Sequence, residues 1–364
     1  MKTLEACRPR RGLSIPCVTV LDPDGGLVER DQRRLVRYLV QSGRGADVIF
    51  VMGTTGEAKR VSSEVRARAT QIVVDEVLAS SARLPAGHPP VEAWAGVTAP
   101  TARETLEAID LALSVGAHGA VIAPLAIPDV DDPVRFIVRD VADLLDARDR
   151  RIPVFLYDNA EIAVGQQRYL RTRWVKQLSR LDFVRGIKVS APPRRLGHYT
   201  KAASRFRDLG DFAIYVGNAL YILEMMRPRE GWLGMLTERW NRFLLHDMLP
   251  AGVVAGPANL FPREWQRAWQ VACVGDVERM SELLDLFGRF RKSYASPAGS
   301  RSLAAIKRGL RALGVIEHAA VARGSADMDP EHARRFEAEL ATLREEMAKR
   351  LPERWISRAS EADG

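Results

Sequence analysis

The chain has 364 residues, of which 46% are hydrophobic and 27% are charged, and its net charge is +8. This is enough apolar material for a large core, but no apolar run reaches the ~18–20 residues that cross a bilayer. The first residues, MKTLEACRPRRG, lack the apolar segment of a secretory signal. We therefore expect a soluble, cytoplasmic protein that does not act at a membrane.

The charged, cysteine and histidine residues exclude several classes of function. Basic residues are scattered instead of forming one face with interleaved aromatics, which argues against nucleic-acid binding. A positive surface can still steer an anionic substrate. Cys7, Cys17 and Cys273 are far apart and form no CxxC pair, and the six histidines show no ligand spacing. The sequence predicts no disulfide framework, no metal site and no cofactor.

Short apolar runs alternate with longer helical patterns along most of the chain. The expected strands are residues 14–21, 47–52, 91–97, 119–124, 152–157, 183–188, 212–217 and 251–256. This alternation is typical of a parallel sheet, and eight units predict a closed (β/α)8 TIM barrel. The alternative, an open doubly wound sheet, calls for a glycine-rich GxGxxG loop after the first strand, and residues 21–29 (LDPDGGLVE) lack one.

Three helices between these strands have clear sequence signals. Residues 27–43 place Leu35, Val36, Leu39 and Val40 on one face. Residues 101–116 open with a Thr-x-x-Glu capping box and close at a glycine, and residues 133–149 begin with proline, which suits a first helical turn.

Two further segments define the expected domain organisation. After a barrel domain over residues 12–275, the strands stop, and helical patterns near 276–293, 299–313 and 330–350 predict a C-terminal helical extension over 276–350. Within the barrel, residues 227–250 form a long insertion with an aromatic stripe at helical spacing. An extra packing helix, a lid and an oligomer contact all remain open for this insertion.

Polar residues at three strand ends are the candidate active site, because catalytic groups of such barrels lie at the carboxyl ends of strands. Lys188 ends the apolar run FVRGIK, Tyr157 ends IPVFLY, and residues 53–57 (GTTGE) follow the second strand. A buried lysine is costly to keep charged, so it is usually paired, exposed or catalytic. As a free amine it could attack a ketone and form a Schiff base, with Tyr157 as a proton shuttle or simply as a buried tyrosine. The backbone of Gly53, Thr54 and Thr55 could hold a carboxylate, or the segment could be only a turn.

The motif GTTGE is followed along the chain by a strand that ends in tyrosine, by a later GIK and by AGVVAGPANLFPREW (251–265). Together these motifs resemble the dihydrodipicolinate synthase / N-acetylneuraminate lyase family over about residues 12–345. The resemblance implies a (β/α)8 barrel with a C-terminal helical extension, often assembled as a homotetramer. It implies that Lys188 forms the Schiff base with pyruvate or another 2-oxo acid and that Tyr157 shuttles protons. It also implies that Thr54 and Thr55 relay protons and hold the keto-acid carboxylate.

The chain departs from that family's pattern at several positions. An arginine five residues after the tyrosine, which binds the second substrate in true dihydrodipicolinate synthases, is replaced by Ile162, and the tyrosine pair after the fourth strand is absent from PLAIPD (124–129). Asp158 could face the substrate or pair with a cation. Asn218 could set specificity or cap a helix. We interpret Ser190, which is soon followed by Pro192, as a helix cap and Glu57 as an acceptor for loop amides.

These observations predict a cofactor-free class I aldolase or lyase that acts on a 2-oxo acid, with an aldehyde as its partner substrate. The expected catalytic residues are Lys188, Tyr157 and Thr54, and the substrate would contact Thr55, Gly53, Asn218 and Asp158. We do not expect dihydrodipicolinate synthesis itself. Three alternatives stay open: a 2-keto-3-deoxy sugar acid dehydratase, a catalytically idle barrel with a binding or regulatory role, and a phosphate-binding barrel isomerase.

Overall fold

The computed structural model of the chain describes residues 9–192, 199, 212–225, 232, 250–295 and 301–363. Its eight strands follow one another in the order of a closed barrel, and every strand pair with a defined register is parallel. The predicted (β/α)8 barrel is therefore confirmed. The strands are β1 (Gly12–Pro16), β2 (Val48–Val51), β3 (Glu92–Gly96), β4 (Gly119–Ile122), β5 (Val154–Asn159), β6 (Val184–Ser190), β7 (Ala213–Val216) and β8 (Gly252–Val254).

Helices occupy the connections and the C-terminal part of the chain. In the described residues, none of them is long and apolar enough to cross a membrane. The helices are α1 (Glu29–Val40), α2 (Ser63–Ala82), α3 (Ala102–Ser114), α4 (Pro133–Arg135), the π-helical segment η4 (Phe136–Val141), α5 (Ala142–Ala147), α6 (Thr172–Leu178), α8 (Tyr221–Met225), α10 (Pro262–Val274), α11 (Val277–Ser293), α12 (Ser302–Ala312) and α13 (Pro330–Arg350).

The chain divides into two compact units. Unit 1 comprises Met1–Gly12 and Trp94–Val254, and unit 2 comprises Leu13–Ala93 and Ala255–Gly364. Unit 1 contains β4 to β8, most of β3 and helices α3 to α8, whereas unit 2 contains most of β1, all of β2 and the remaining helices. The predicted boundary between a barrel domain (12–275) and a helical extension (276–350) stays a prediction.

An aromatic cluster fills the inner face of the strands in unit 1. Trp94 stacks on Phe155 with ring centroids 4.0 Å apart, and both rings meet Tyr215 edge-on. Glycines on neighbouring strands make room for these rings, since a Cβ atom at Gly119 would lie 2.9 Å from Phe155 and one at Gly252 would lie 2.9 Å from Tyr215. Phe155 precedes Tyr157 by two residues on β5, so this packed layer supports the side chains nearest the carboxyl end of the strand.

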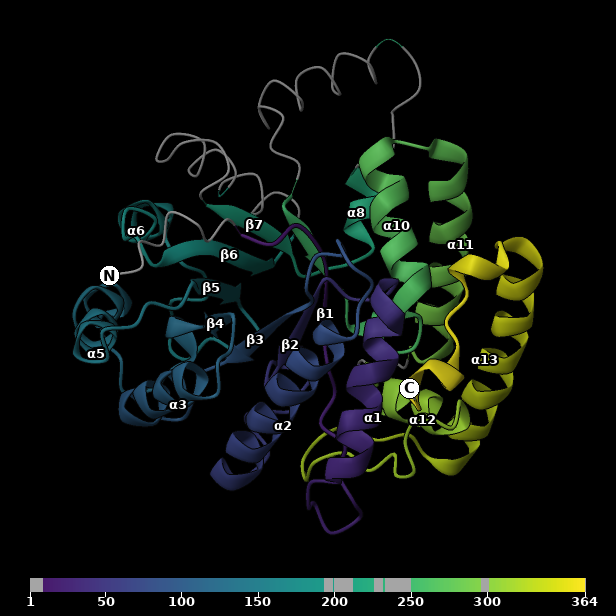
Figure 1. The fold of residues 1–364 in the computed structure, drawn as a ribbon, viewed down its shortest axis with the longest axis horizontal. Coiled ribbons are helices and arrows are strands. Elements are labelled where there is room, and N and C mark those ends of the chain that lie inside the picture. The colour runs from purple at the N-terminus through teal and green to yellow at the C-terminus, as the bar shows by residue number, and fades with distance from the viewer. Residues whose placement is uncertain are drawn as a thin grey trace. The chain divides into compact units, whose positions relative to one another are not determined.

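The helices of unit 2 pack through large aromatic side chains. The predicted face of α1 is buried, with Leu35, Val36 and Leu39 all fully inaccessible to solvent. Trp265 of α10 stacks on Phe287 of α11 at a centroid distance of 4.2 Å, and Figure 1 shows α11 beside α13. The helices predicted after residue 276 are confirmed by α11, α12 and α13.

Local sequence signals also set the helix boundaries in unit 1. Thr101 accepts a hydrogen bond from the Glu104 amide at 3.2 Å, which confirms it as the N-cap of α3, and its hydroxyl donates to the Glu104 carboxylate at 3.3 Å. The helix predicted over residues 133–149 is confirmed from Pro133 to Ala147, where α4, the π-helical η4 and α5 follow one another without a break. Asp132 caps the start of this segment through the amides of Val134 and Arg135.

The first predicted strand is shorter than residues 14–21, because β1 ends at Pro16. Beyond Pro16, side chains accept the hydrogen bonds that the carbonyls of a neighbouring strand would accept in a sheet. The Asn259 side chain accepts from the Val18 amide, and the Gln32 side chain accepts from the Val20 amide. The predicted insertion over 227–250 lies outside the described residues, except for Trp232 and Pro250.

Candidate active site

Lys188 is a buried lysine on a central strand of unit 1. It lies on β6, where its register partners are Tyr157 on β5 and Tyr215 on β7, and only 7% of its surface is exposed. Its Nζ atom is 3.9 Å from the centroid of the Tyr157 ring. The amino group of Lys188 therefore lies against the electron-rich face of the tyrosine ring. Lys188 and Tyr157 are thus brought together as the sequence predicted.

The phenolic oxygen of Tyr157 accepts two hydrogen bonds. Asn159 Nδ2 donates to Tyr157 Oη at 3.0 Å, and Ser190 Oγ donates to the same oxygen at 3.4 Å. Both donors follow from strand geometry, since residues two apart on a strand share a face: 157 and 159 on β5, and 188 and 190 on β6. Four polar side chains therefore lie on one face of two paired strands.

The interpretation of Ser190 as a helix cap is wrong. Ser190 is the last residue of β6, paired in register with Asn159. The next strand leaves room for its hydroxyl, because Gly217 follows β7 and a Cβ atom there would lie 2.1 Å from Ser190 Oγ. Asn159 and Ser190 were missed as functional candidates, although their two-residue spacing from Tyr157 and Lys188 was a signal that could have found them.

Asp158 does not have the substrate-facing position predicted for it. Strand alternation puts it on the face of β5 opposite Tyr157, and it is 1% exposed. Its Oδ1 atom accepts from the Leu170 amide at 2.8 Å, and its Oδ2 atom accepts from the Tyr199 hydroxyl. Contrary to the predicted substrate contact, this carboxylate fastens the segment after β5 to the body of unit 1.

Asn218 lies in the turn between β7 and α8 and is half-buried. Its backbone carbonyl accepts from the Tyr221 amide at 3.1 Å, which starts the short helix α8. This position agrees with a residue at a strand end, and a specificity role for its side chain stays a prediction.

The loop Gly53–Glu57 belongs to unit 2 and follows β2. Its backbone turns tightly, since the Gly56 amide donates to the Gly53 carbonyl at 3.0 Å and the Glu57 amide donates to the Thr54 carbonyl at 3.1 Å. Gly53 has no space for a side chain, because a Cβ atom would lie 2.6 Å from the Phe50 ring. Thr54 is exposed and Thr55 is half-buried, so both hydroxyl-bearing residues stand on the outside of this turn.

Glu57 fixes the end of that loop through a fully buried ion pair. Lys307 of α12 donates to Glu57 Oε2 at 2.5 Å, and neither side chain is exposed. Glu57 Oε1 accepts from the Ala322 amide and from Ser325 Oγ, each at 2.7 Å. Burial is the main reason that the pKa of Lys307 is lowered, against the opposing effect of Glu57. Glu57 therefore accepts a hydrogen bond from a backbone amide, as predicted. That amide belongs to the segment after α12, whereas the prediction was an amide of the loop.

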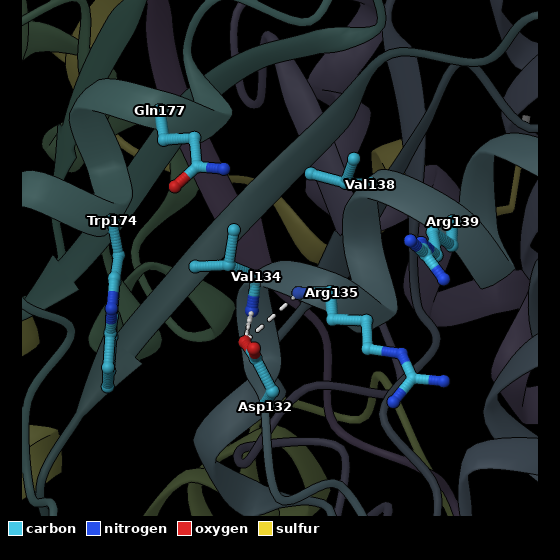
Figure 2. A pocket seen from close by; sticks show the side chains of 7 residues that line it. All are labelled: Asp132, Val134, Arg135, Val138, Arg139, Trp174 and Gln177. Atoms are coloured by element: carbon cyan, nitrogen blue, oxygen red, sulfur yellow. Dashed lines mark hydrogen bonds between the residues drawn. The ribbon is translucent and has the colours of Figure 1, made fainter.

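A surface hollow lies elsewhere on unit 1. It has a volume of about 480 Å³ and is lined by Asp132, Arg135 and Arg139 at the start of α4 and in η4, and by Trp174 and Gln177 of α6. Figure 2 shows Asp132 directed at the amides of Val134 and Arg135, where it caps the helix. Lys188 and Tyr157 do not line this hollow, so it is separate from the candidate active site.

Comparisons with known proteins identify the family of the chain. Residues 9–125 match the model of the dihydrodipicolinate synthetase family. A 4-hydroxy-tetrahydrodipicolinate synthase of Thermus thermophilus is 30% identical over 278 residues, which cover 74% of this chain and 77% of that protein.

Solved structures share the fold. The dihydrodipicolinate synthase of Bacteroides thetaiotaomicron superposes with a TM-score of 0.72 at 21% identity, covering 92% of this chain and 99% of that one. YagE, a prophage protein of the dihydrodipicolinic acid synthase family from E. coli K12 solved with pyruvate, has a TM-score of 0.70 at 20% identity, covering 92% and 98%. The chain belongs to the dihydrodipicolinate synthetase family and, like the members of that family, is a class I lyase.

Proposed function

We propose that the protein is a Schiff-base lyase for pyruvate or another 2-oxo acid, with Lys188 as the residue that forms the imine. The observation that carries this proposal is the buried Lys188 side chain, whose Nζ atom lies 3.9 Å from the Tyr157 ring centroid. A nucleophilic amine beside a proton-carrying hydroxyl residue is the arrangement that imine chemistry needs. The pyruvate bound to YagE supports the same class of substrate.

In the proposed reaction, the uncharged Lys188 amine attacks the carbonyl carbon, and the carbonyl electron pair moves to oxygen, which takes a proton. The nitrogen loses a proton, the protonated hydroxyl leaves as water, and a protonated imine remains. That iminium accepts the electron pair of the bond between C3 and C4 as the C4 hydroxyl loses its proton, which releases an aldehyde. The enamine then gains a proton at C3, and hydrolysis returns pyruvate and the amine. Tyr157 is proposed to give and take these protons.

The carboxylate of the 2-oxo acid is proposed to bind the loop after β2. Gly53 is buried against the Phe50 ring and so fixes the start of the turn, whereas Thr54 is exposed and Thr55 is half-buried. Hydroxyls and amides around a tight turn suit a carboxylate, which accepts several hydrogen bonds at once. Thr54 is further proposed to relay a proton, and Asn218 to contact the second substrate.

The second substrate is proposed to be a neutral aldehyde. Ile162, half-buried five residues after Tyr157, supplies no positive charge for a second carboxylate, and residues 124–129 contain no tyrosine. These departures argue against dihydrodipicolinate synthesis as the cellular reaction. A homo-oligomeric assembly and a cytoplasmic location stay predictions.

Product analysis tests this proposal. We expect a panel of 4-hydroxy-2-oxo acids to yield pyruvate and an aldehyde in equal amounts, and Lys188→Ala to yield neither. Loss of water from a 2-keto-3-deoxy sugar acid without release of an aldehyde would instead identify a dehydratase. No turnover of any member, together with no trapped imine, would overturn the proposed chemistry.

A further inference from the structure

The phenolic oxygen of Tyr157 accepts hydrogen bonds from side chains on two strands of the same chain. Asn159 approaches it along β5 and Ser190 approaches it from β6, at 3.0 and 3.4 Å. Asn159 is 8% exposed and Tyr157 is 7% exposed, so both hydrogen-bond in a site largely closed to water. In such surroundings a donor that points at an oxygen has a larger electrostatic effect than it has in bulk water.

The backbone fixes which end of the Asn159 amide faces the tyrosine. Its Oδ1 atom accepts from the Glu161 amide at 3.0 Å. A backbone N–H can only donate, so the oxygen of the side chain must face Glu161 and the Nδ2 group must face Tyr157. Asn159 is therefore a donor of fixed orientation toward Tyr157 Oη.

A glycine at the end of the neighbouring strand makes room for the Ser190 side chain. The Gly217 amide donates to the Val189 carbonyl at 2.8 Å, which continues the pairing of β6 with β7. A Cβ atom at Gly217 would lie 2.1 Å from Ser190 Oγ, so only glycine leaves the hydroxyl in its place. Ser190 Oγ then lies within reach of Tyr157 Oη across the β5–β6 pair.

We propose that Asn159 and Ser190 are positioning residues that stabilise the Tyr157 phenolate during the proton transfers of the imine reaction. When Tyr157 gives its proton to the substrate, negative charge develops on an oxygen toward which two donors already point. Hydrogen bonds to the charged form favour that form, so the two donors lower the free energy needed to form the phenolate. The arrangement needs no side chain from a second copy of the chain. This inference rests on the proposed imine chemistry and adds to it the groups that control its proton carrier.

Exchange of the methyl protons of pyruvate for deuterium tests the inference without knowledge of the second substrate. Exchange requires the imine and the transfer of a C3 proton, and proton NMR follows it across a range of pH. We expect Ser190→Ala and Asn159→Leu each to slow exchange about tenfold near neutral pH, the loss expected for one hydrogen bond to a charged group. Each should also move the rising limb of the pH–rate profile toward higher pH by about one pH unit.

Two further variants separate the electrostatic role from packing. Asn159→Asp keeps the shape and the contact with the Glu161 amide but replaces the donor by an acceptor, so we expect it to move the limb further than Asn159→Leu does. Ser179→Ala removes another buried hydroxyl, which donates to the Lys176 carbonyl on α6, and should leave the profile unchanged.

Borohydride trapping of pyruvate on the same proteins keeps the two proposals distinguishable. Trapped imine with unshifted profiles in the Asn159 and Ser190 variants would overturn this inference and leave the proposed function standing. Absence of trapped imine in the unmodified protein would overturn the proposed function, and this inference with it. A shift of equal size in Ser179→Ala would also contradict the assignment, because it would reveal a general effect of lost packing.

Discussion

Lys188 Nζ lies 3.9 Å from the centroid of the Tyr157 ring, and the two residues are register partners on β6 and β5. The ring contacts the lysine, whereas the hydroxyl contacts Asn159 and Ser190. Tyr157 therefore makes two kinds of contact that a substitution can separate.

Tyr157→Phe keeps the ring beside Lys188 and removes only the hydroxyl. We expect little loss of stability and continued trapping of the imine, but a turnover slowed by about 10²–10⁴-fold, the usual effect of losing a general acid or base. Borohydride trapping with pyruvate measures the imine, and the rates of cleavage of a 4-hydroxy-2-oxo acid and of proton exchange in pyruvate measure the proton transfers. An unchanged rate of proton exchange in this variant would exclude Tyr157 as the proton carrier.

The buried ion pair between Glu57 and Lys307 predicts a large effect on stability. Lys307→Met leaves the Glu57 carboxylate buried without its cation, so we expect a loss of about 3–5 kcal/mol in the free energy of unfolding. The double variant Glu57→Gln/Lys307→Met should lose less than the sum of the two single variants, because it leaves no unpaired charge.

Urea denaturation measures these differences, and Glu337→Gln is the matched control. Glu337 pairs with Arg311 on the surface of the same unit, so its loss should cost at most about 1 kcal/mol. Because Glu57 closes the loop that carries Thr54 and Thr55, the Lys307 variant should also need more pyruvate for half-maximal trapping. Equal stabilities of the Lys307 and Glu337 variants would contradict the assigned role.

Glu264 predicts a pH-dependent term in stability. Burial raises the pKa of this carboxyl above its usual 4.5, against the opposing effects of Ser357 and Arg344. A carboxyl with a higher pKa when folded contributes stability below pH 4.5 that is lost as the pH rises through the folded pKa. We expect the stability of the wild type relative to Glu264→Gln to fall between pH 4 and pH 7.

Denaturation curves at the two pH values check this difference. Glu278→Gln is the control, since Glu278 is exposed in the first turn of α11. A relative stability that rises over this range would mean that the Glu264 carboxyl titrates below its ordinary value.

The cysteines predict a pattern of chemical labelling. Burial raises the pKa of Cys17 to about 12, whereas Cys273 is exposed on α10. With such a pKa only about one thiol in ten thousand is ionised at pH 8, and the thiolate is the reactive form. Iodoacetamide should label the Cys273 peptide in the folded protein and the Cys17 peptide only after unfolding. Peptide mapping by mass spectrometry reads both sites, and rapid labelling of Cys17 in the native protein would contradict its burial.

The barrel could be predicted from sequence because its signals are local. Each strand is a short apolar run, and boundary residues such as Thr101 and Pro133 act on their own neighbours. Lys188 and Tyr157 stood out because each is a polar residue at the end of such a run.

The rest of the site depends on contacts between distant residues. Ser190 reaches Tyr157 across 33 positions, and Lys307 reaches Glu57 across 250. Neither pairing leaves a periodic signal along the chain, because strand register and helix packing create it. Asp158 was predicted on the wrong face, although strand alternation already places it opposite Tyr157.

Mapping of a trapped imine tests the central claim most directly. The protein is incubated with pyruvate and reduced with borohydride, and its peptides are then examined by mass spectrometry, with Lys188→Ala and Lys307→Met as the two lysine variants. We predict one reduced pyruvate adduct per chain, on Lys188, absent from Lys188→Ala and retained by the folded fraction of Lys307→Met. An adduct on another lysine, or none with pyruvate and longer 2-oxo acids, would contradict the account.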